Sequence, residues 1–244
     1  MSHATLYHGD CLERMRAMPD ACVDAIITDP PYCAGSVSES GRSAAKYQGL
    51  RQGTAARMGW FVGDNMTTAG LAWLLRMVAF EARRVMRHTG HMLCFMDWRM
   101  SPTLLPAIES AGLRYQNLVV WDKGVMGLGC GFRSNHELIG HFTNGSPEYH
   151  DASRGNILRH SRVRSGDREH QTQKPVGLMR DLIAVTVPPG GVVLDPFAGS
   201  GSTLLAAITS GRDAIGIERD AGFVEIAERR VGEQPSLFPE ERPA

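Results

Sequence analysis

The stretch Ala25-Ile26-Ile27-Thr28-Asp29-Pro30-Pro31-Tyr32 joins an apolar run to a carboxylate, two prolines and an aromatic ring. The apolar run is typical of a buried strand. Because proline has no N–H and restricts the preceding residue to extended conformations, Pro30 and Pro31 predict a stiff loop at the strand end. Open α/β sheets bind ligands just past the carboxyl ends of their strands, so this loop is a candidate site. An ordinary Asx-Pro turn is the alternative.

The charge of the chain is balanced overall and uneven along its length. The 244 residues suffice for one sizeable α/β domain with insertions or for two small domains. Lys and Arg number 26, as do Asp and Glu, so net charge indicates no polyanionic partner. However, residues 40–63 hold four cations and no acid, and residues 154–174 hold six cations against two acids. Such segments are expected of loops that face a polyanion, and also of plain solvated loops.

The cysteines and the apolar segments bear on the compartment. The five cysteines form no Cys-x-x-Cys pair, which disfavours a disulfide framework or a zinc knuckle and favours a reducing cytoplasm. The beginning of the sequence lacks the apolar core of a signal peptide, and the most apolar helical stretch, residues 71–80, is short and contains Arg76. We therefore expect a cytoplasmic protein without a membrane segment.

Periodicity and turn residues predict strands that alternate with helices. The expected strands span residues 5–8, 23–28, 91–96, 115–121, 137–142, 191–195 and 213–217. The expected helices span residues 11–18, 67–87, 102–110, 174–187, 202–210 and 222–231. This alternation is typical of β-α-β units and a parallel sheet. Residues 33–66 suggest a lid, and residues 144–173 a weakly structured insert.

A second constellation follows much later, where a strand, a Gly-x-Gly turn, a helix and another strand end in an acid. Gly199 and Gly201 would let a ligand approach the backbone, and Glu218 would accept hydrogen bonds from ribose hydroxyls. Leu204 stands where a dinucleotide fingerprint needs a third glycine, and Asp195 suits a cation better than a pyrophosphate. The pattern favours S-adenosylmethionine, which carries a ribose and positive charges but no phosphate. A tight turn without a ligand is the alternative.

Asp29-Pro30-Pro31-Tyr32 before Asp195-Pro196-Phe197-Ala198-Gly199-Ser200-Gly201 resembles the amino-methyltransferases of DNA, which act on exocyclic nitrogens. The motif order is similar to that of their β group. The resemblance covers nearly the whole chain, including the segments 9–11, 173–176 and 216–218. It implies an α/β, Rossmann-like methyltransferase fold with a circularly permuted motif order and a mostly parallel sheet with helices on both faces. Strands from both ends of the chain would then lie side by side.

The resemblance also implies roles for individual residues. The catalytic segment would be Asp29, Pro30, Pro31 and Tyr32, with Asp29 and the Pro30 carbonyl accepting hydrogen bonds from the target amine and Tyr32 stacking on the base. A base inside a duplex is unreachable, so the nucleotide would be flipped out. The cofactor S-adenosylmethionine would contact Asp10, Cys11, Lys174, Asp195, Pro196, Phe197, Ala198, Gly199, Ser200, Gly201 and Glu218.

The target base is indicated by the first residue of the catalytic motif. Family members whose motif begins with Asp mostly act on adenine, and those with Ser mostly on cytosine, so the resemblance favours N6 of adenine over N4 of cytosine. C5-cytosine chemistry needs a Pro-Cys dipeptide, which the sequence lacks. A DNA-binding module that has lost activity and a dehydrogenase are alternatives from other classes.

The segment from His136 to His141 contains two histidines around a glutamate, but it does not predict a metal site. A zinc protease motif needs histidines four apart on one helical face, whereas a spacing of five places them about 140° apart.

We expect one methyltransferase domain over residues 1–232, with residues 33–66 and 125–170 as target-recognition inserts, and a disordered Pro/Glu-rich tail over residues 233–244. In the tail, Gln234-Pro235-Ser236-Leu237-Phe238 resembles the pentapeptide by which bacterial proteins dock on the replication sliding clamp. A chance apolar pair is the alternative. The resemblance implies double-stranded DNA as the partner, and association with the nucleoid through that DNA. The sliding clamp and a second copy of the chain are further candidates.

Overall fold

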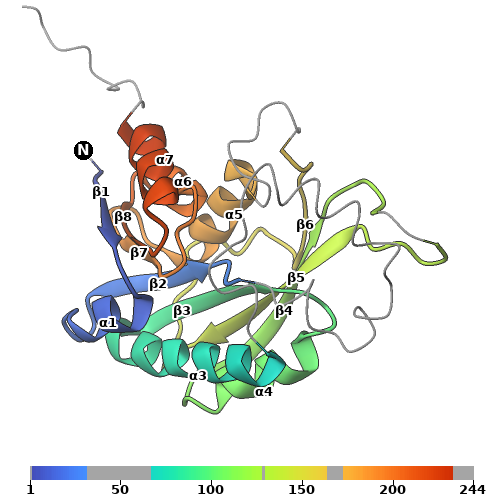
Figure 1. The fold of residues 1–244 in the computed structure, drawn as a ribbon, viewed down its shortest axis with the longest axis horizontal. Coiled ribbons are helices and arrows are strands. Elements are labelled where there is room, and N and C mark those ends of the chain that lie inside the picture. The colour runs from blue at the N-terminus through green and yellow to red at the C-terminus, as the bar shows by residue number, and fades with distance from the viewer. Residues whose placement is uncertain (1, 32–66, 128–129, 164–172, 233–244) are drawn as a thin grey trace, which may run out of the picture.

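Strand β2 (Val23–Thr28) is buried along its whole length, as its apolar sequence predicts, and lies in the middle of a mixed sheet. The computed structural model describes residues 2–31, 67–127, 130–163 and 173–232. Within them the sheet has eight strands in the order β1-β8-β7-β2-β3-β5-β4-β6 (Figure 1). The other strands are β1 (Ala4–His8), β3 (Met86–Met96), β4 (Arg114–Asp122), β5 (His136–Thr143), β6 (Ile157–Arg159), β7 (Val192–Asp195) and β8 (Asp213–Glu218).

The two ends of the sequence meet in this sheet. β1 pairs with β8, and β7 pairs with β2, both in parallel. Among the described strands β5 runs antiparallel to its neighbours β3 and β4, and the other neighbouring pairs are parallel. The predicted mostly parallel sheet and permuted motif order are confirmed. β1 and β2 lie in one sheet but are separated by β8 and β7, so they do not form an adjacent β-α-β pair.

Helices cover both faces of the sheet (Figure 1). On one face α1 (Cys11–Arg16), α3 (Thr68–Val85) and α4 (Ser101–Glu109) bury apolar side chains such as Leu75 and Met92. On the other face α5 (Val176–Thr186) and α6 (Ser202–Ile208) pack on Ile27 and Phe95. α7 (Ala221–Gly232) lies beside α6 near the edge formed by β1 and β8.

The end of α3 and the content of the insert 144–173 differ from the sequence prediction. α3 begins as expected, because the Thr67 hydroxyl accepts a hydrogen bond of 3.1 Å from the Gly70 N–H. It ends at Val85, earlier than predicted, since the chain passes directly into an extended β3. The insert expected to be weakly structured contains β6, three residues that pair with β4. Three residues are too few to show an alternating pattern.

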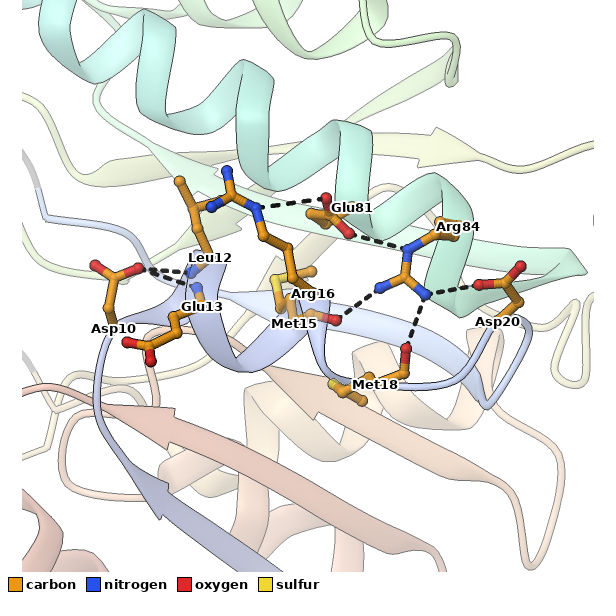
Figure 2. Close-up of polar contacts among 9 residues, drawn as sticks. All are labelled: Asp10, Leu12, Glu13, Met15, Arg16, Met18, Asp20, Glu81 and Arg84. Carbon is orange, nitrogen blue, oxygen red and sulfur yellow. Dashed lines mark hydrogen bonds and ion pairs between the residues drawn. The ribbon is translucent and has the colours of Figure 1, made fainter.

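Arg84 connects α3 to the end of α1 (Figure 2). Its guanidinium donates hydrogen bonds to the backbone oxygens of Met15 at 2.7 Å and Met18 at 2.8 Å. It also pairs with Glu81 at 3.0 Å and Asp20 at 2.6 Å. Glu81 is 8 % exposed, so its carboxylate depends on this cation, whereas the Asp20 side chain is 78 % exposed and gains little.

Several predicted segments lie outside the described residues. These are the whole insert 33–66, part of the insert 125–170, Tyr32, and the tail with Gln234–Phe238. No helix in the described part of the chain combines the length and apolar character needed to cross a bilayer.

Candidate active site

Asp29 follows the end of β2, directly beside the second motif. Thr28, the last residue of β2, is fully buried, and its hydroxyl donates a hydrogen bond of 2.8 Å to Oδ1 of Asp195 at the end of β7. Because β2 and β7 are parallel neighbours, this bond joins the two strand ends. Pro30 is buried and Pro31 is half-buried. The two motifs, separated by more than half of the sequence, therefore meet at one edge of the sheet.

The carboxylate of Asp195 is enclosed by protein groups. It is 3 % exposed, and in addition to Thr28 it accepts hydrogen bonds from the Thr203 hydroxyl at 2.6 Å and the Phe197 N–H at 3.1 Å. Burial raises the pKa of Asp195 to about 7, against the opposing effect of these hydrogen bonds. The sequence suggested a place beside a cationic ligand. In the structure the contacts of Asp195 hold β7 to β2 and to α6, and so shape the glycine turn.

Within the turn one glycine faces open space and the next faces α7. Gly199 has a φ of +51°, and nothing lies within 4 Å of the position that a Cβ would take. Gly201 has a φ of +78°, and a Cβ there would stand 3.0 Å from the Cβ of Ala227. Ser200 is buried, and its hydroxyl accepts a hydrogen bond of 2.9 Å from Arg230. Gly199 is therefore where a ligand can approach the backbone, whereas Ser200 and Gly201 close the turn onto α7.

The first half of the turn is packed into the fold. Pro196 and Ala198 are buried, and the Ala198 N–H donates a hydrogen bond of 2.9 Å to the Ile217 oxygen of β8. The half-buried Phe197 packs against the apolar layer beneath α1 and α3. These contacts fix the position of the turn between β7 and β8.

Glu218, the last residue of β8, presents its carboxylate to the turn. Its Oε2 accepts a hydrogen bond of 2.8 Å from the Gly199 N–H. Its Oε1 accepts hydrogen bonds of 2.8 Å from the N–H groups of Arg219 and Asp220. The predicted pair of a glycine turn and an acid at the next strand end is therefore in direct contact.

The end of β1 completes this part of the edge. The Gly9 N–H donates a hydrogen bond of 2.9 Å to the backbone oxygen of Glu218. Asp10 is exposed and caps α1, accepting from the N–H groups of Leu12 at 3.0 Å and Glu13 at 3.2 Å. For the neighbouring Cys11, burial raises the pKa of the thiol to about 12, so this side chain packs rather than reacts.

Lys174 connects Asp29 to a second carboxylate. Its side chain is 5 % exposed, and Nζ lies 2.7 Å from Oδ2 of Asp29 and 2.9 Å from Oε2 of Glu137. Lys123 pairs with the other oxygen of Glu137. Asp29, Lys174, Glu137 and Lys123 therefore form a row of alternating charges, here called the charge cluster. It joins the ends of β2 and β4 to the starts of β5 and α5.

Within the charge cluster, opposite charges outweigh the effect of burial on Lys174 and Glu137. Burial alone would lower the pKa of Lys174, but the carboxylates of Asp29 and Glu137 outweigh it and raise that pKa. Burial would likewise raise the pKa of Glu137, but the two ammonium groups lower it. Burial lowers the pKa of Lys123, which has Glu137 as its counter-ion.

Aromatic rings contact the ammonium groups of the charge cluster. Nζ of Lys174 lies 4.9 Å from the ring centroid of Phe95 and 5.8 Å from that of Trp121. Nζ of Lys123 lies 4.9 Å from the Trp121 ring. The indole N–H of Trp121 donates a hydrogen bond of 2.7 Å to the His160 oxygen. Cations over ring faces gain electrostatic stabilisation as well as shelter from water.

Sequence reasoning missed Lys123, Glu137 and Trp121. Glu137 was considered only as part of a rejected zinc motif, and the structure places that motif in strand β5. One signal was available. Glu137 opens an expected strand, and Lys123 follows the end of another, so an antiparallel hairpin would bring the two together.

A hollow of about 360 Å³ lies away from this edge, on the sheet face covered by α5. Its walls include Asn117 and His141 from the sheet, Thr186 from α5, and Tyr149 from the loop between β5 and β6. None of the predicted catalytic or cofactor-binding residues lines it, although Tyr149 belongs to the predicted insert 125–170.

Comparison with known proteins agrees with this geometry. Residues 23–229 match the model of the N6/N4 DNA methylase family. The chain belongs to this family. It is 32 % identical to the methylase YubD of Escherichia coli K12, over 91 % of this chain and 88 % of that protein. It is 28 % identical to the DNA adenine methyltransferase YhdJ of the same strain, over 93 % and 82 %. The predicted family is confirmed.

Solved structures show the same fold. The complex of M1.HpyAVI with S-adenosylmethionine has a TM-score of 0.67 at 21 % identity and covers 93 % of this chain and 98 % of its own. The cytosine-N4-specific PvuII DNA methyltransferase has a TM-score of 0.74 at 18 % identity, over 99 % and 90 %. The predicted methyltransferase fold is confirmed.

Methyltransferases of this family use S-adenosylmethionine. The edge between β1, β7 and β8 fits this molecule. Gly199 leaves open space beside its backbone, Glu218 accepts a hydrogen bond from the Gly199 N–H, and the exposed Asp10 caps α1 just after the end of β1. A nucleoside with two ribose hydroxyls and positive charge matches these acceptors.

Proposed function

We propose that this DNA methylase transfers a methyl group from S-adenosylmethionine to N6 of adenine in a flipped-out nucleotide. The observation that carries the proposal is the position of Asp29, held beside the glycine turn by the Thr28–Asp195 hydrogen bond and paired with a buried cation. The motif that begins with Asp and the similarity to an adenine methyltransferase support adenine. N4 of cytosine is the second candidate, supported by the similarity of the fold to a cytosine-N4 enzyme.

The chemistry requires a better nucleophile than an exocyclic amine normally provides. Its lone pair is delocalised into the base, and acceptors aimed at its two N–H bonds favour a pyramidal nitrogen whose lone pair can attack. Asp29 and the Pro30 carbonyl are these acceptors in the proposal, and Tyr32 would stack on the base. When bound, S-adenosylmethionine would supply an electrophilic methyl group on its sulfonium. The lone pair of the amine nitrogen would form the new N–C bond, the electron pair of the broken C–S bond would stay on sulfur, and the nitrogen would release one proton to solvent.

Catalysis by this site would come from position and fixed charge. Asp29 is fixed by Lys174, and the turn is fixed by Asp195 and Glu218, so the reacting groups meet without a large rearrangement of the edge. In the proposal Asp10, Cys11, Pro196, Phe197, Ala198, Gly199, Ser200, Gly201 and Glu218 form the cofactor side of the site.

We also propose which segments of the chain contact partners. Residues 33–66 and 125–170 would contact double-stranded DNA, within a single domain over residues 1–232. Binding of the tail to a sliding clamp, and formation of a homodimer, stay predictions. A pull-down that survives Leu237→Ala with Phe238→Ala would end the clamp hypothesis.

Tritiated methyl transfer to unmethylated duplex DNA, followed by mass spectrometry of the nucleosides, tests the proposed function. We expect N6-methyladenine. Detection of N4-methylcytosine instead would contradict adenine as the target and support the second candidate, N4 of cytosine. Binding of S-adenosylmethionine without transfer to any tested DNA would indicate a DNA-binding module without activity. A thermal shift with NAD and none with S-adenosylmethionine would revive the dehydrogenase alternative.

A further inference from the structure

We propose that Lys174 is a positioning residue of the catalytic carboxylate rather than a ligand of the cofactor, and that Glu137 and Lys123 hold it in that role. The inference rests on the proposed function, because it assigns the chemistry to Asp29. It moves Lys174 from the cofactor side of the site, where the motif resemblance put it, to the target-amine side.

Geometry supports this assignment. Nζ of Lys174 lies 2.7 Å from Asp29 and 2.9 Å from Glu137, so its positive charge is already paired with two carboxylates. A buried cation also suits the sulfonium and ammonium of the cofactor poorly, because like charges repel. Opposite charge at hydrogen-bond distance keeps a carboxylate ionised and limits its rotation. Both effects act on the hydrogen-bond acceptor that the target amine needs.

Glu137 has the corresponding role for Lys174. A buried lysine loses its proton readily unless carboxylates hold it, and Glu137 is one of the two carboxylates paired with Lys174. Glu137 and Lys123 flank the segment between β4 and β5, part of the predicted recognition insert 125–170. The charge cluster therefore connects the base of a predicted DNA-contacting segment to Asp29.

Further ionisable groups adjoin the charge cluster, and they share its electrostatic field. Cys94 and Asp195 interact with Asp29, and Asp97 and Arg162 interact with Lys123. Burial raises the pKa of Cys94 beyond the range in which the thiol titrates in solution. Asp195, whose pKa burial raises to about 7, is therefore the group expected to add to a pH profile of activity near neutrality, whereas the raised pKa of Lys174 bears on the alkaline limb.

The test measures kcat and the KM of both substrates against pH for the full-length wild type and for Lys174→Met, Lys174→Arg and Glu137→Gln. Without its cation the Asp29 carboxylate is harder to ionise, so Lys174→Met should move the acid limb of kcat upward by about one pH unit. It should lower kcat about tenfold or more near neutral pH. Lys174→Arg should restore the position of the acid limb. Glu137→Gln should move the alkaline limb downward, since Lys174 would lose its proton more easily.

Binding of S-adenosylmethionine to the same variants, measured by calorimetry without DNA, separates the two roles of Lys174. We expect the affinity of Lys174→Met to stay within about threefold of the wild type. A large loss of affinity with unmoved pH limbs would overturn the inference and return Lys174 to the cofactor side. If Lys174→Met does not fold, Glu137→Gln decides: a shifted alkaline limb supports the inference, and an unshifted one overturns it. Absence of transfer by the wild type would instead refute the proposed function.

Discussion

Two networks of alternating charge lie in different parts of this molecule. In the first, Arg84 bridges Glu81 and Asp20 at the outer side of α1 and α3 (Figure 2). In the second, Lys174 bridges Asp29 and Glu137 at the edge where the sequence motifs meet. The Arg84 side chain is 30 % exposed, whereas that of Lys174 is 5 % exposed, so the second cation is far more costly to hold.

The partners of the two cations explain the difference. Arg84 also donates to backbone oxygens of Met15 and Met18, so it holds the end of α1 in place with a planar fork of donors. Lys174 presents its charge to a carboxylate in the catalytic motif. A buried ion pair adds little net stability, and one at a strand end of the candidate site is better explained by chemistry. The comparison suggests that Arg84 serves stability and Lys174 serves the reaction.

The largest effect is expected at the catalytic end of the second network. Asp29→Ala removes the acceptor proposed for the target amine, and we expect the rate of methyl transfer to fall at least about a thousandfold. Binding of duplex DNA should change little, because the substitution is confined to the strand end. Radiolabel transfer and DNA mobility shifts measure the two properties. Retained transfer would overturn the role of Asp29.

The first network should respond in stability. Arg84→Met removes the hydrogen bonds to two backbone oxygens and, among the residues that the structure describes, leaves the buried Glu81 carboxylate with the long 4.0 Å contact to Arg16 as its remaining ion pair. We expect the free energy of unfolding to fall by about 2–4 kcal/mol.

Chemical denaturation measures that change, and Arg76→Met on the same helix is the matched control. Arg76 is exposed and has a 3.0 Å hydrogen bond to the Ser110 hydroxyl. Its loss should cost less than about 1 kcal/mol. Equal losses in the two variants would show that the Arg84 network has no special structural role.

The smallest effect concerns a buried histidine pair outside both networks. Nε2 of His91 lies 2.7 Å from the Glu148 carbonyl oxygen, so it must donate, and Nδ1 of His91 then accepts from Nε2 of His141 at 3.0 Å. Burial lowers the pKa of both rings, that of His141 to about 4. Because the folded-state pKa is lowered, the stabilisation is present above the unfolded pKa of about 6.5 and is lost as the pH falls toward 4.

We therefore expect the free energy of unfolding to fall by about 1–2 kcal/mol between about pH 7 and pH 5 through this pair. The change is measured by denaturation at a series of pH values. His141→Gln should reduce the fall in the free energy of unfolding between about pH 7 and pH 5. His3→Gln, at an exposed position near the start of the sequence, should leave that fall unchanged. An unaltered slope in His141→Gln would contradict the assignment.

Much of the fold follows from local sequence patterns. The prediction of β2 has the same bounds as the structure, because a largely apolar run between Pro19-Asp20 and Asp29-Pro30 leaves little choice of strand position. The juxtaposition of the two motifs followed from topology, since parallel strands present their carboxyl ends at one edge. β6 was missed because its pairing with β4 depends on a partner distant in the sequence.

The candidate site was less predictable, for a related reason. Gly199 and Glu218 could be paired from spacing in a known fold, and they are in contact. The packing of Gly201 on Ala227 depends on α7, and the contacts of Glu137 depend on three segments meeting in space. The hairpin of β4 and β5 could have indicated the contact of Glu137 with Lys123, but no local pattern in the sequence indicates its contact with Lys174 or the packing of Gly201 on Ala227.

We infer that the buried cation of Lys174 serves the reaction, and the most direct test compares Lys174→Met with Arg84→Met. The measurement is the rate of methyl transfer to duplex DNA per folded molecule, at saturating S-adenosylmethionine and well below both melting temperatures. We expect a rate about tenfold or more below wild type for Lys174→Met and a rate within about twofold of wild type for Arg84→Met. Equal rates in the two folded variants would contradict it.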